Sequence, residues 1–223
     1  MIRAVVFDLD GTLVHFDLDY AALKSEIIAA LARLGIPTST FSPQDTLTDL
    51  LDKVEAYIKA SGLNKGEVKK IWNEVFRVAE QFERASVETA RLMPGAADVL
   101  AALREKGLKI GLLTLNSSAV AMNVLGRLGI KKFFDVLVAR DFVEEVKPNP
   151  GHLSRVLEEL GVRPEEAIVV GDTVFDIRCA KKVGAIAIGI TTGRSSEEEL
   201  RKAGADYVIS SLTQLPALLL EIS

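Results

Sequence analysis

Short apolar runs recur along the chain, and each of them ends in polar or glycine residues. The first run spans 4–7 and stops at Asp8, and the others lie at 108–113, 136–139, 167–170 and 185–190, with a weaker one at 207–209. Runs of this length are typical of β-strands that are buried on both faces. We therefore predict a strand at each of these positions.

Segments with the apolar period of an α-helix lie between these runs, at 96–105, 118–128, 151–160, 175–183 and 196–203. Strands that alternate with helices of this length indicate βαβ units and a parallel sheet. Ligands of such sheets bind at the carboxyl ends of the strands. The pattern predicts an α/β core with its functional site at that edge.

The alternation stops between the first strand and the second, where only helical period is found. We expect an inserted all-helical cap over 15–91 and a core formed by 1–14 together with 92–223. Within the insertion, Ser42 and Pro43 open the second predicted helix. Asn64 and Glu67 have the spacing of a capping box, which predicts the start of a third, longer helix.

The composition is that of an ordinary globular protein without a strong charge. The 223 residues include 27 Lys and Arg against 31 Asp and Glu, a net charge of −4. This balance provides no global field for nucleic acid or an anionic membrane, so an anionic ligand must be bound locally.

The single cysteine, Cys179, cannot form an internal disulfide, which favours a reducing compartment. The four apolar residues before Asp8 are too few for a signal peptide, and no run approaches the length of a membrane span. We therefore expect a cytoplasmic protein with no membrane segment.

Two acidic residues, Asp8 and Asp10, follow the first predicted strand. On an extended backbone their side chains point to the same side, because side chains alternate with period two. Carboxylates that converge in this way repel each other unless a cation lies between them or one is protonated. Gly11 lets the backbone turn close to a ligand. In isolation the tetrapeptide fits a solvated turn equally well.

A second acidic pair, Asp172 and Asp176, follows the apolar run at 167–170. Two acidic pairs at the carboxyl ends of parallel strands form the kind of oxygen site that Mg²⁺ prefers, with waters and a substrate phosphate as further ligands. The alternative is that Asp172 merely caps the next helix, which leaves Asp176 unexplained.

Polar residues that suit phosphate binding follow two other elements. Thr114 ends the strand at 108–113, and Asn116 lies just before a helix whose free N–H groups could hold a phosphate. Lys147 lies in a rigid Lys-Pro-Asn-Pro turn before the helix at 151–160. Taken singly, Asn116 is an ordinary helix-capping residue and Lys147 fits a solvated lysine.

The order of these motifs along the chain resembles that of the haloacid dehalogenase superfamily of phosphohydrolases. Residues 7–13, Phe-Asp-Leu-Asp-Gly-Thr-Leu, match the first motif of that family without a departure. The insertion resembles the helical cap of its phosphoglycolate-phosphatase-like and phosphoglucomutase-like branch. The resemblance implies a Rossmann-like core with helices on both faces, dependence on Mg²⁺ and an aspartyl-phosphate intermediate.

The resemblance also implies roles for the acidic residues. Asp8 would be the nucleophile and a direct Mg²⁺ ligand, and Asp10 would be the general acid and base, with its main-chain carbonyl on the metal. Asp172 would bind Mg²⁺ directly. Asp176 would hold a metal-bound water or orient Lys147.

For the phosphoryl group, the resemblance implies binding by Thr114 and Lys147. Asn116 stands two positions after Thr114, whereas many relatives have an asparagine next to the threonine. Asn116 is also expected to bind phosphate, although it departs from the family pattern in this way.

The expected activity is hydrolysis of a small phosphorylated metabolite. A phosphomutase uses the same residues, and the cap decides between the two. A dehalogenase, which needs no Mg²⁺, and a non-enzymatic phospho-switch or binding domain fit the motifs less well. The substrate and the oligomeric state stay open. Cap residues that could face the site are His15, Tyr20, Lys24, Lys53, Lys65, Lys69, Arg77 and Arg84.

Overall fold

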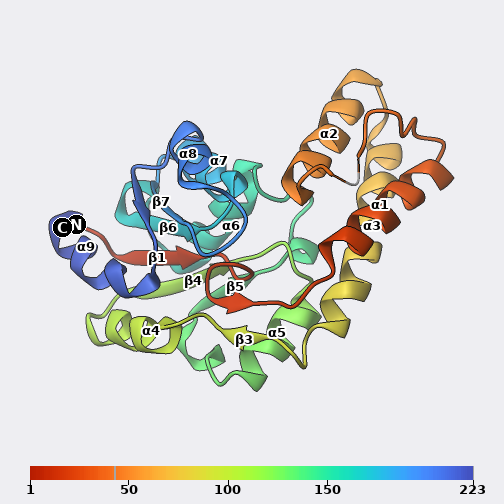
Figure 1. The fold of residues 1–223 in the computed structure, drawn as a ribbon. Coiled ribbons are helices and arrows are strands. Elements are labelled where there is room, and N and C mark those ends of the chain that lie inside the picture. The colour runs from red at the N-terminus through yellow and green to blue at the C-terminus, as the bar shows by residue number, and fades with distance from the viewer. Residues whose placement is uncertain (43, 223) are drawn as a thin grey trace. The chain divides into compact units, whose positions relative to one another are not determined.

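The computed structural model describes residues 1–42 and 44–222. These residues form two compact units. The core unit comprises Met1–Phe16 and Val87–Ser223, and the helical unit comprises Asp17–Ser86. The chain thus leaves the core after Phe16 and returns to it at Val87, some seventy residues later, with the helical unit as an insertion (Figure 1).

The core unit is built on a six-stranded sheet in which every pairing is parallel. The strand order is β5-β4-β1-β6-β7-β8. The strands are β1 (Ala4–Phe7), β4 (Lys109–Leu113), β5 (Val136–Val138), β6 (Ala167–Gly171), β7 (Ile186–Ile190) and β8 (Tyr207–Ile209). Each strand of the sheet lies within one residue of its predicted position, and the predicted α/β class is confirmed.

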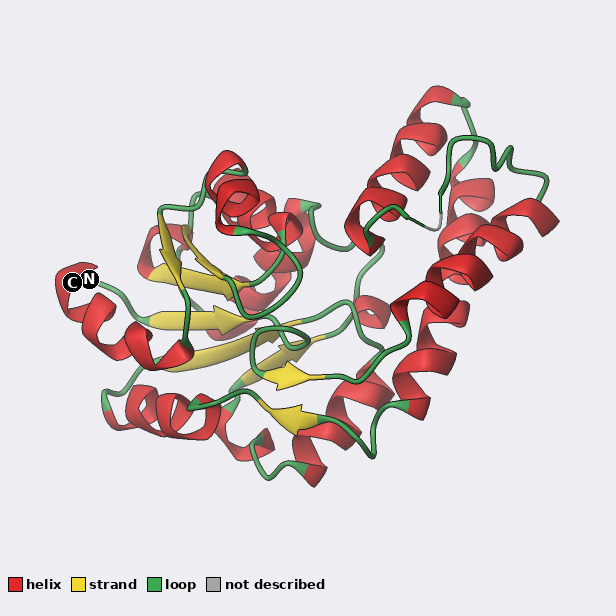
Figure 2. Ribbon diagram, viewed as in Figure 1, coloured by secondary structure: helices red, strands yellow, loops and turns green. Residues whose placement is uncertain are grey.

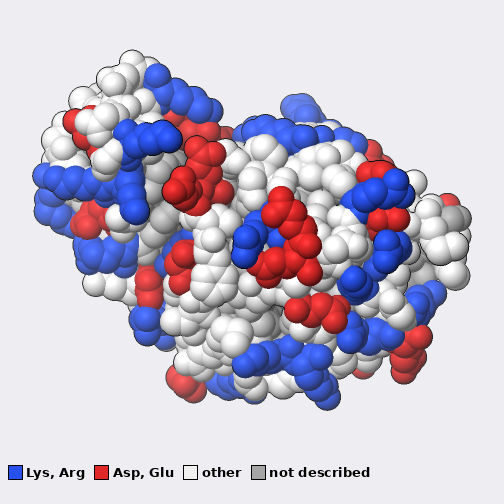
Figure 3. Space-filling view, turned by 180° about the vertical axis from the view of Figure 1, so that it is seen from behind, with Lys and Arg blue, Asp and Glu red and all other residues white. Residues whose placement is uncertain are grey.

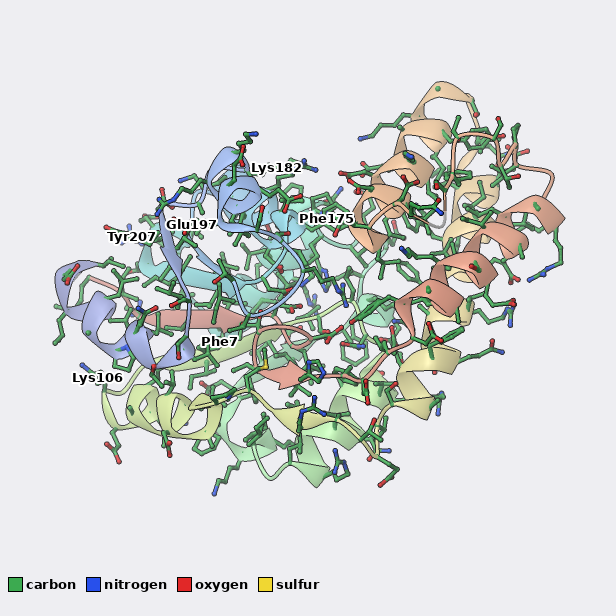
Figure 4. The ribbon with its side chains drawn as sticks, viewed as in Figure 1. Phe7, Lys106, Phe175, Lys182, Glu197 and Tyr207 are labelled. Atoms are coloured by element: carbon green, nitrogen blue, oxygen red, sulfur yellow. The ribbon has the colours of Figure 1, made fainter. Side chains whose placement is uncertain are left out.

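The register of the central strands brings their carboxyl ends to one level. Phe7, the last residue of β1, pairs with Leu112 of β4 and with Val170 of β6. The side chain of Phe7, which is labelled in Figure 4, is fully buried. The polar residues that follow these three strands therefore emerge side by side at one edge.

Helices cover both faces of the sheet (Figure 2). On one face, α6 and α7 pack against each other and against the sheet, and α8 packs against β7 and β8. Helix α4 packs against β4 and α9. The helices of the core are α4 (Ala96–Glu105), α5 (Ser118–Arg127), α6 (Pro150–Leu160), α7 (Val174–Val183), α8 (Glu197–Lys202) and α9 (Leu215–Ile222). Short 3-10 turns lie at Lys131–Phe133, Arg140–Phe142, Pro164–Glu166 and Leu212–Gln214.

Two features of the core were not predicted. A two-residue antiparallel ladder joins β2 (Val14–His15) to β3 (Arg91–Leu92), at the points where the chain leaves and re-enters the core. Helix α9 is a nearly continuous apolar stretch, so its sequence carries no period that separates helix from strand.

The helical unit contains α1 (Tyr20–Arg33), α2 (Leu47–Ala60) and α3 (Lys65–Ala85), which share one buried apolar cluster. The predicted capping box of Asn64 and Glu67 begins α3. The start of α2 differs from the prediction, because Thr46 caps it through a reciprocal bond with Asp49. The predicted start at Ser42 and Pro43 is therefore too early, and Pro43 itself lies outside the described residues.

Candidate active site

A buried lysine joins two of the predicted acidic residues. Asp8 follows β1 directly, and Lys147 lies in the turn before α6. The Lys147 ammonium donates to Asp8 Oδ1, to Asp176 Oδ1 at 2.6 Å and to the main-chain oxygen of Leu113 at 3.3 Å. Only 3% of Lys147 is exposed, so it is not the solvated lysine that the turn alone allowed.

Three carboxylates lie close to one another at this point. Asp8, Asp172 and Asp176 each offer one oxygen, and these oxygens lie within 4.8 Å of one another. All three residues are buried, and Asp172 and Asp176 are fully so. The sequence therefore predicted correctly that the two acidic motifs converge at one edge of the sheet.

The cap of α7 is Thr173 and not Asp172. Asp176 completes the capping box, because its Oδ2 accepts from the Thr173 main-chain N–H at 3.1 Å and from the Thr173 hydroxyl at 2.6 Å. Its other oxygen, Oδ1, accepts from Lys147. Asp176 thus has both a helix-capping contact and a site contact, while Asp172 is free of any capping role in α7.

The cluster carries more negative charge than Lys147 neutralises. Burial raises the pKa of Asp8, and the neighbouring Asp176 and Asp172 raise it further against the opposing effect of Lys147. Burial raises the pKa of Asp172 to about 6. For Lys147, burial alone would lower the pKa, but Asp176 and Asp8 outweigh it and the pKa is raised. The lysine stays charged, and the carboxylates favour a further cation.

The donor set fits a magnesium ion. Carboxylate oxygens are hard ligands of the type that Mg²⁺ prefers, and Mg²⁺ is commonly held by one or two carboxylates together with water and phosphate oxygens. Here three buried carboxylates converge with an excess of negative charge. The residues present at this edge are therefore suited to the ion.

The predicted phosphate-binding residues form a compact turn after β4. The Thr114 hydroxyl donates to Asn116 Oδ1 at 2.9 Å and accepts from the Asn116 main-chain N–H at 3.1 Å. Ser117, and not Asn116, caps α5. Although Leu115 separates Thr114 from Asn116, the turn brings their side chains together, and both are buried.

The carboxylate of Asp10 does not contact Lys147 in the described structure but pairs with an arginine beside the cluster. Its Oδ2 accepts from the guanidinium of Arg194, which lies in the loop after β7. Asp10 does not belong to the described group of three carboxylates. The sequence predicted that Asp8 and Asp10 would share a side of the strand, and it did not identify Arg194 as a partner.

Other residues of the site were also missed. Thr12 donates to Asp172 Oδ1 at 3.3 Å, and His152 is fully buried. His152 Nδ1 accepts from the main-chain N–H of Lys147 at 3.2 Å, and Nε2 lies 3.2 Å from the main-chain oxygen of Val138. Arg140, also buried, donates to the main-chain oxygen of Leu115.

Glycines leave the space that the carboxylates occupy. A Cβ on Gly193 would lie 1.9 Å from Asp172 Oδ2, and one on Gly11 would lie 2.5 Å from the same oxygen. A Cβ on Gly171 would lie 2.3 Å from Cγ of Asp176. Side chains at these positions would displace the acidic residues.

Several of the basic residues suggested as substrate contacts are engaged within the helical unit. Lys53 pairs with Asp45, Arg77 with Glu74 and Arg84 with Glu80. Lys24 donates to the main-chain oxygen of Asp45. These contacts give the four residues a role in the helical unit itself.

A family model described as haloacid dehalogenase-like hydrolase matches residues 2–184. The phosphoglycolate phosphatase of Shigella boydii serotype 4 (strain Sb227) is 32% identical, covering 97% of this chain and 92% of its own length. That of Escherichia coli (strain K12) is 31% identical with the same coverage.

Solved structures agree with this result. The HAD phosphatase from Thermococcus onnurineus is 26% identical, covers 98% of both chains and has a TM-score of 0.63. A putative β-phosphoglucomutase from Thermotoga maritima is 25% identical, covers 100% of both chains and has a TM-score of 0.66. The chain belongs to the haloacid dehalogenase-like hydrolases, in the phosphoglycolate-phosphatase-like branch, as the motifs predicted.

Gly193→Ala should remove the stabilisation of the protein by Mg²⁺. A ligand that binds only the folded state raises its stability, and the new Cβ would force Asp172 or the loop to move. The test is the thermal unfolding midpoint with and without Mg²⁺. Gly126→Ala is the matched control, because Gly126 lies in α5 with nothing within 4 Å of an added Cβ. An unchanged Mg²⁺-dependent shift of the unfolding midpoint in Gly193→Ala would contradict the inference that Gly193 leaves the space that Asp172 needs in order to bind the ion.

His152 should make the fold sensitive to mild acid. Burial and, as a smaller effect, the charge of Lys147 lower the pKa of His152 to about 3. In the unfolded chain the pKa of a histidine is about 6.5. For this group the unfolded chain binds more protons below about pH 6.5, so His152 lowers the free energy of unfolding as the pH falls. Asp172, whose pKa is raised to about 6, acts in the opposite direction, and the effect of His152 is therefore measured as a difference between variant and wild type.

Between about pH 6.5 and pH 5, the free energy of unfolding of His152→Gln should fall less, or rise more, than that of the wild type, whatever its stability at neutral pH. Denaturant unfolding at several pH values measures the difference, and the control His15→Gln should keep the pH dependence of the wild type. An unchanged pH dependence in His152→Gln would assign the acid sensitivity to other groups.

Proposed function

We propose that this protein is a Mg²⁺-dependent phosphatase that hydrolyses a small phosphomonoester through an aspartyl-phosphate on Asp8. The observation that carries the proposal is the buried cluster in which the Lys147 ammonium contacts Asp8 and Asp176 beside Asp172. Relatives that are named phosphoglycolate phosphatases support a phosphomonoester as the substrate.

In the first half-reaction, a carboxylate oxygen of Asp8 attacks phosphorus and the bond from phosphorus to the leaving oxygen breaks. Asp10 gives its proton to that oxygen, so the product leaves as an alcohol. In the second, water attacks phosphorus, Asp10 takes a proton from the water, and the bond between Asp8 and phosphorus breaks. Asp8 and Asp10 thereby return to their starting states.

The basic and polar residues lower the cost of bringing two anions together. A phosphomonoester dianion and the Asp8 carboxylate repel each other, and the charged Lys147 counters this repulsion from a buried position. We assign Thr114 and Asn116 to the phosphoryl oxygens, with the turn after β4 holding both side chains in place.

The bound Mg²⁺ would supply positive charge that stabilises the phosphoryl oxygens. Asp8, Asp172 and the main-chain carbonyl of Asp10 would hold it, and Asp176 would act as an outer ligand that also fixes Lys147. The raised pKa of Asp172 and the excess of buried carboxylates are consistent with this assignment.

We further propose that the helical insertion is a cap that contributes to substrate choice, with 1–14 and 92–223 as the catalytic core. In the structure the first segment of the core unit ends at Phe16 and its second segment begins at Val87, close to these bounds. A small phosphorylated metabolite is the expected partner.

Charge and hydropathy favour a small ligand over a large one. On the face drawn in Figure 3, lysine and arginine side chains are interspersed with aspartate and glutamate. No helix in the described parts of the chain has both the length and the hydropathy of a membrane span. A reducing, cytoplasmic compartment stays a prediction from Cys179, which is buried and free.

A phosphomutase is the second candidate, because the putative β-phosphoglucomutase of Thermotoga maritima matches the whole chain. A mutase returns the phosphoryl group from the aspartate to a sugar instead of to water. Release of inorganic phosphate from a panel of phosphomonoesters separates the two, since a mutase interconverts sugar phosphates and releases little phosphate.

With Mg²⁺ present, the protein should release phosphate from at least one member of a panel that includes 2-phosphoglycolate, sugar phosphates and nucleoside monophosphates. Asp8→Asn should abolish turnover, because an amide is not a nucleophile. Asp10→Asn should slow turnover by about 10²-fold or more through loss of proton transfer.

Lys106→Ala is the control for these variants, since Lys106 is exposed at the end of α4 (Figure 4). Chelation of the metal should stop the reaction. More than a few per cent of activity in Asp8→Asn, or full activity in excess chelator, would contradict the proposal.

A further inference from the structure

The loop 192–195, which follows β7, contacts both acidic motifs of the site. The Thr192 hydroxyl donates to the main-chain oxygen of Gly11 at 2.8 Å. The main-chain N–H groups of Arg194 and Ser195 donate to Asp172, at 2.8 Å to Oδ2 and at 3.1 Å to its main-chain oxygen. None of the roles assigned above uses this loop.

Arg194 takes part in these contacts in two separable ways. Its main-chain N–H holds Asp172, and its guanidinium donates to Asp10 Oδ2. The close approach of Gly193 to Asp172 leaves the loop little room to shift. The backbone that carries the guanidinium toward Asp10 is therefore fixed by its hydrogen bond to Asp172, in the other acidic motif.

Two basic residues donate to the four acidic residues. Lys147 donates to Asp8 and Asp176, and the Arg194 main chain donates to Asp172. The Arg194 guanidinium donates to Asp10. The side chain of Arg194 is 26% exposed and that of Asp10 is 12% exposed, so the pair lies at the open side of the buried cluster.

We propose that Arg194 is a positioning residue that fixes the orientation of the Asp10 carboxylate for proton transfer. This inference rests on the proposed function, in which Asp10 exchanges a proton with the leaving oxygen and with water. The planar guanidinium restricts the rotation of a carboxylate more than a point charge does. A small misplacement of a reacting group is costly, so the loss of Arg194 should slow the chemistry.

The test compares Arg194→Ala and Arg194→Lys with the wild type on two substrates. The first is 2-phosphoglycolate, an alkyl phosphate whose leaving oxygen needs a proton. The second is p-nitrophenyl phosphate, whose leaving group departs as an anion. Arg194→Ala keeps the main-chain bond to Asp172, so it changes only the side-chain contact.

Arg194→Ala should lower kcat on 2-phosphoglycolate by at least about tenfold with KM changed by less than about twofold. Hydrolysis of the aspartyl-phosphate is common to both substrates, so the comparison between them uses the rate of leaving-group release in a single turnover, which should fall less on p-nitrophenyl phosphate. Arg194→Lys should lie between Arg194→Ala and the wild type. Arg201→Ala, which removes an exposed pairing with Glu197 on α8, is the matched control and should behave as the wild type.

The decisive variant combines Arg194→Ala with Asp10→Asn. If Arg194 acts through Asp10, its loss should cost less than about twofold further in the Asp10→Asn background. An undiminished effect in that background, a rise in KM alone, an equal loss in the single-turnover rate of leaving-group release on both substrates or a wild-type kcat in Arg194→Ala would each overturn the proposal.

Failure of the proposed function has a different result from failure of this inference. If the wild type with Mg²⁺ releases phosphate from no member of the panel, or if Asp8→Asn keeps its activity, the proposed function is wrong. An alkyl phosphate of the panel that the wild type hydrolyses takes the place of 2-phosphoglycolate if that compound is not a substrate. If the wild type, Asp8→Asn and Asp10→Asn behave as proposed and Arg194→Ala does not, only the role of Arg194 is wrong. Circular dichroism of each variant establishes that it is folded, and Arg194→Lys keeps the test valid if Arg194→Ala is not.

Discussion

The contact of one buried ammonium with two carboxylates connects the parts of this site. Lys147 reaches Asp8 at the end of β1 and Asp176 in the first turn of α7, and it also donates to Leu113 at the end of β4. A buried charge is costly unless it is paired, so neither the lysine nor the carboxylates could stay there alone. The positions of three segments at the carboxyl edge of the sheet thus depend on a single side chain.

The same cluster links structure to chemistry, because it is left with an excess of negative charge. Three carboxylates face one lysine in a buried position, and the pKa of Asp172 is raised to about 6. A site of this kind favours a divalent cation and, through it, a phosphoryl group. His152 and Thr173 support this arrangement. His152 Nδ1 accepts from the main-chain N–H of Lys147, and the Thr173 hydroxyl donates to Asp176.

Much of the fold and of the acidic site could be predicted from the sequence, because both depend on local patterns. The apolar runs placed every strand of the sheet, and parallel strands bring the residues after their carboxyl ends together. The sequence therefore identified the three acidic residues by their positions after predicted strands, namely Asp8, Asp172 and Asp176. Arg194 could not be found in this way, since its role comes from a loop that packs across two other motifs. The signal was present as a polar Thr-Thr-Gly-Arg segment directly after β7, but arginine and glycine are ordinary loop residues. Helix α9 lacked a period, and the two-residue ladder of β2 and β3 is too short to show one.

The central claim is that phosphorus, and not the Asp8 carboxyl carbon, is attacked by water. A single turnover of p-nitrophenyl phosphate in heavy-oxygen water, followed by mass spectrometry of the released phosphate and of the peptide that contains Asp8, tests it most directly. If Asp8 carries a phosphoryl group that water opens at phosphorus, the label enters phosphate and the Asp8 oxygens stay unlabelled. Label in the Asp8 peptide would contradict the account, because it would mean attack at the carboxyl carbon, as in the hydrolysis of an alkyl ester.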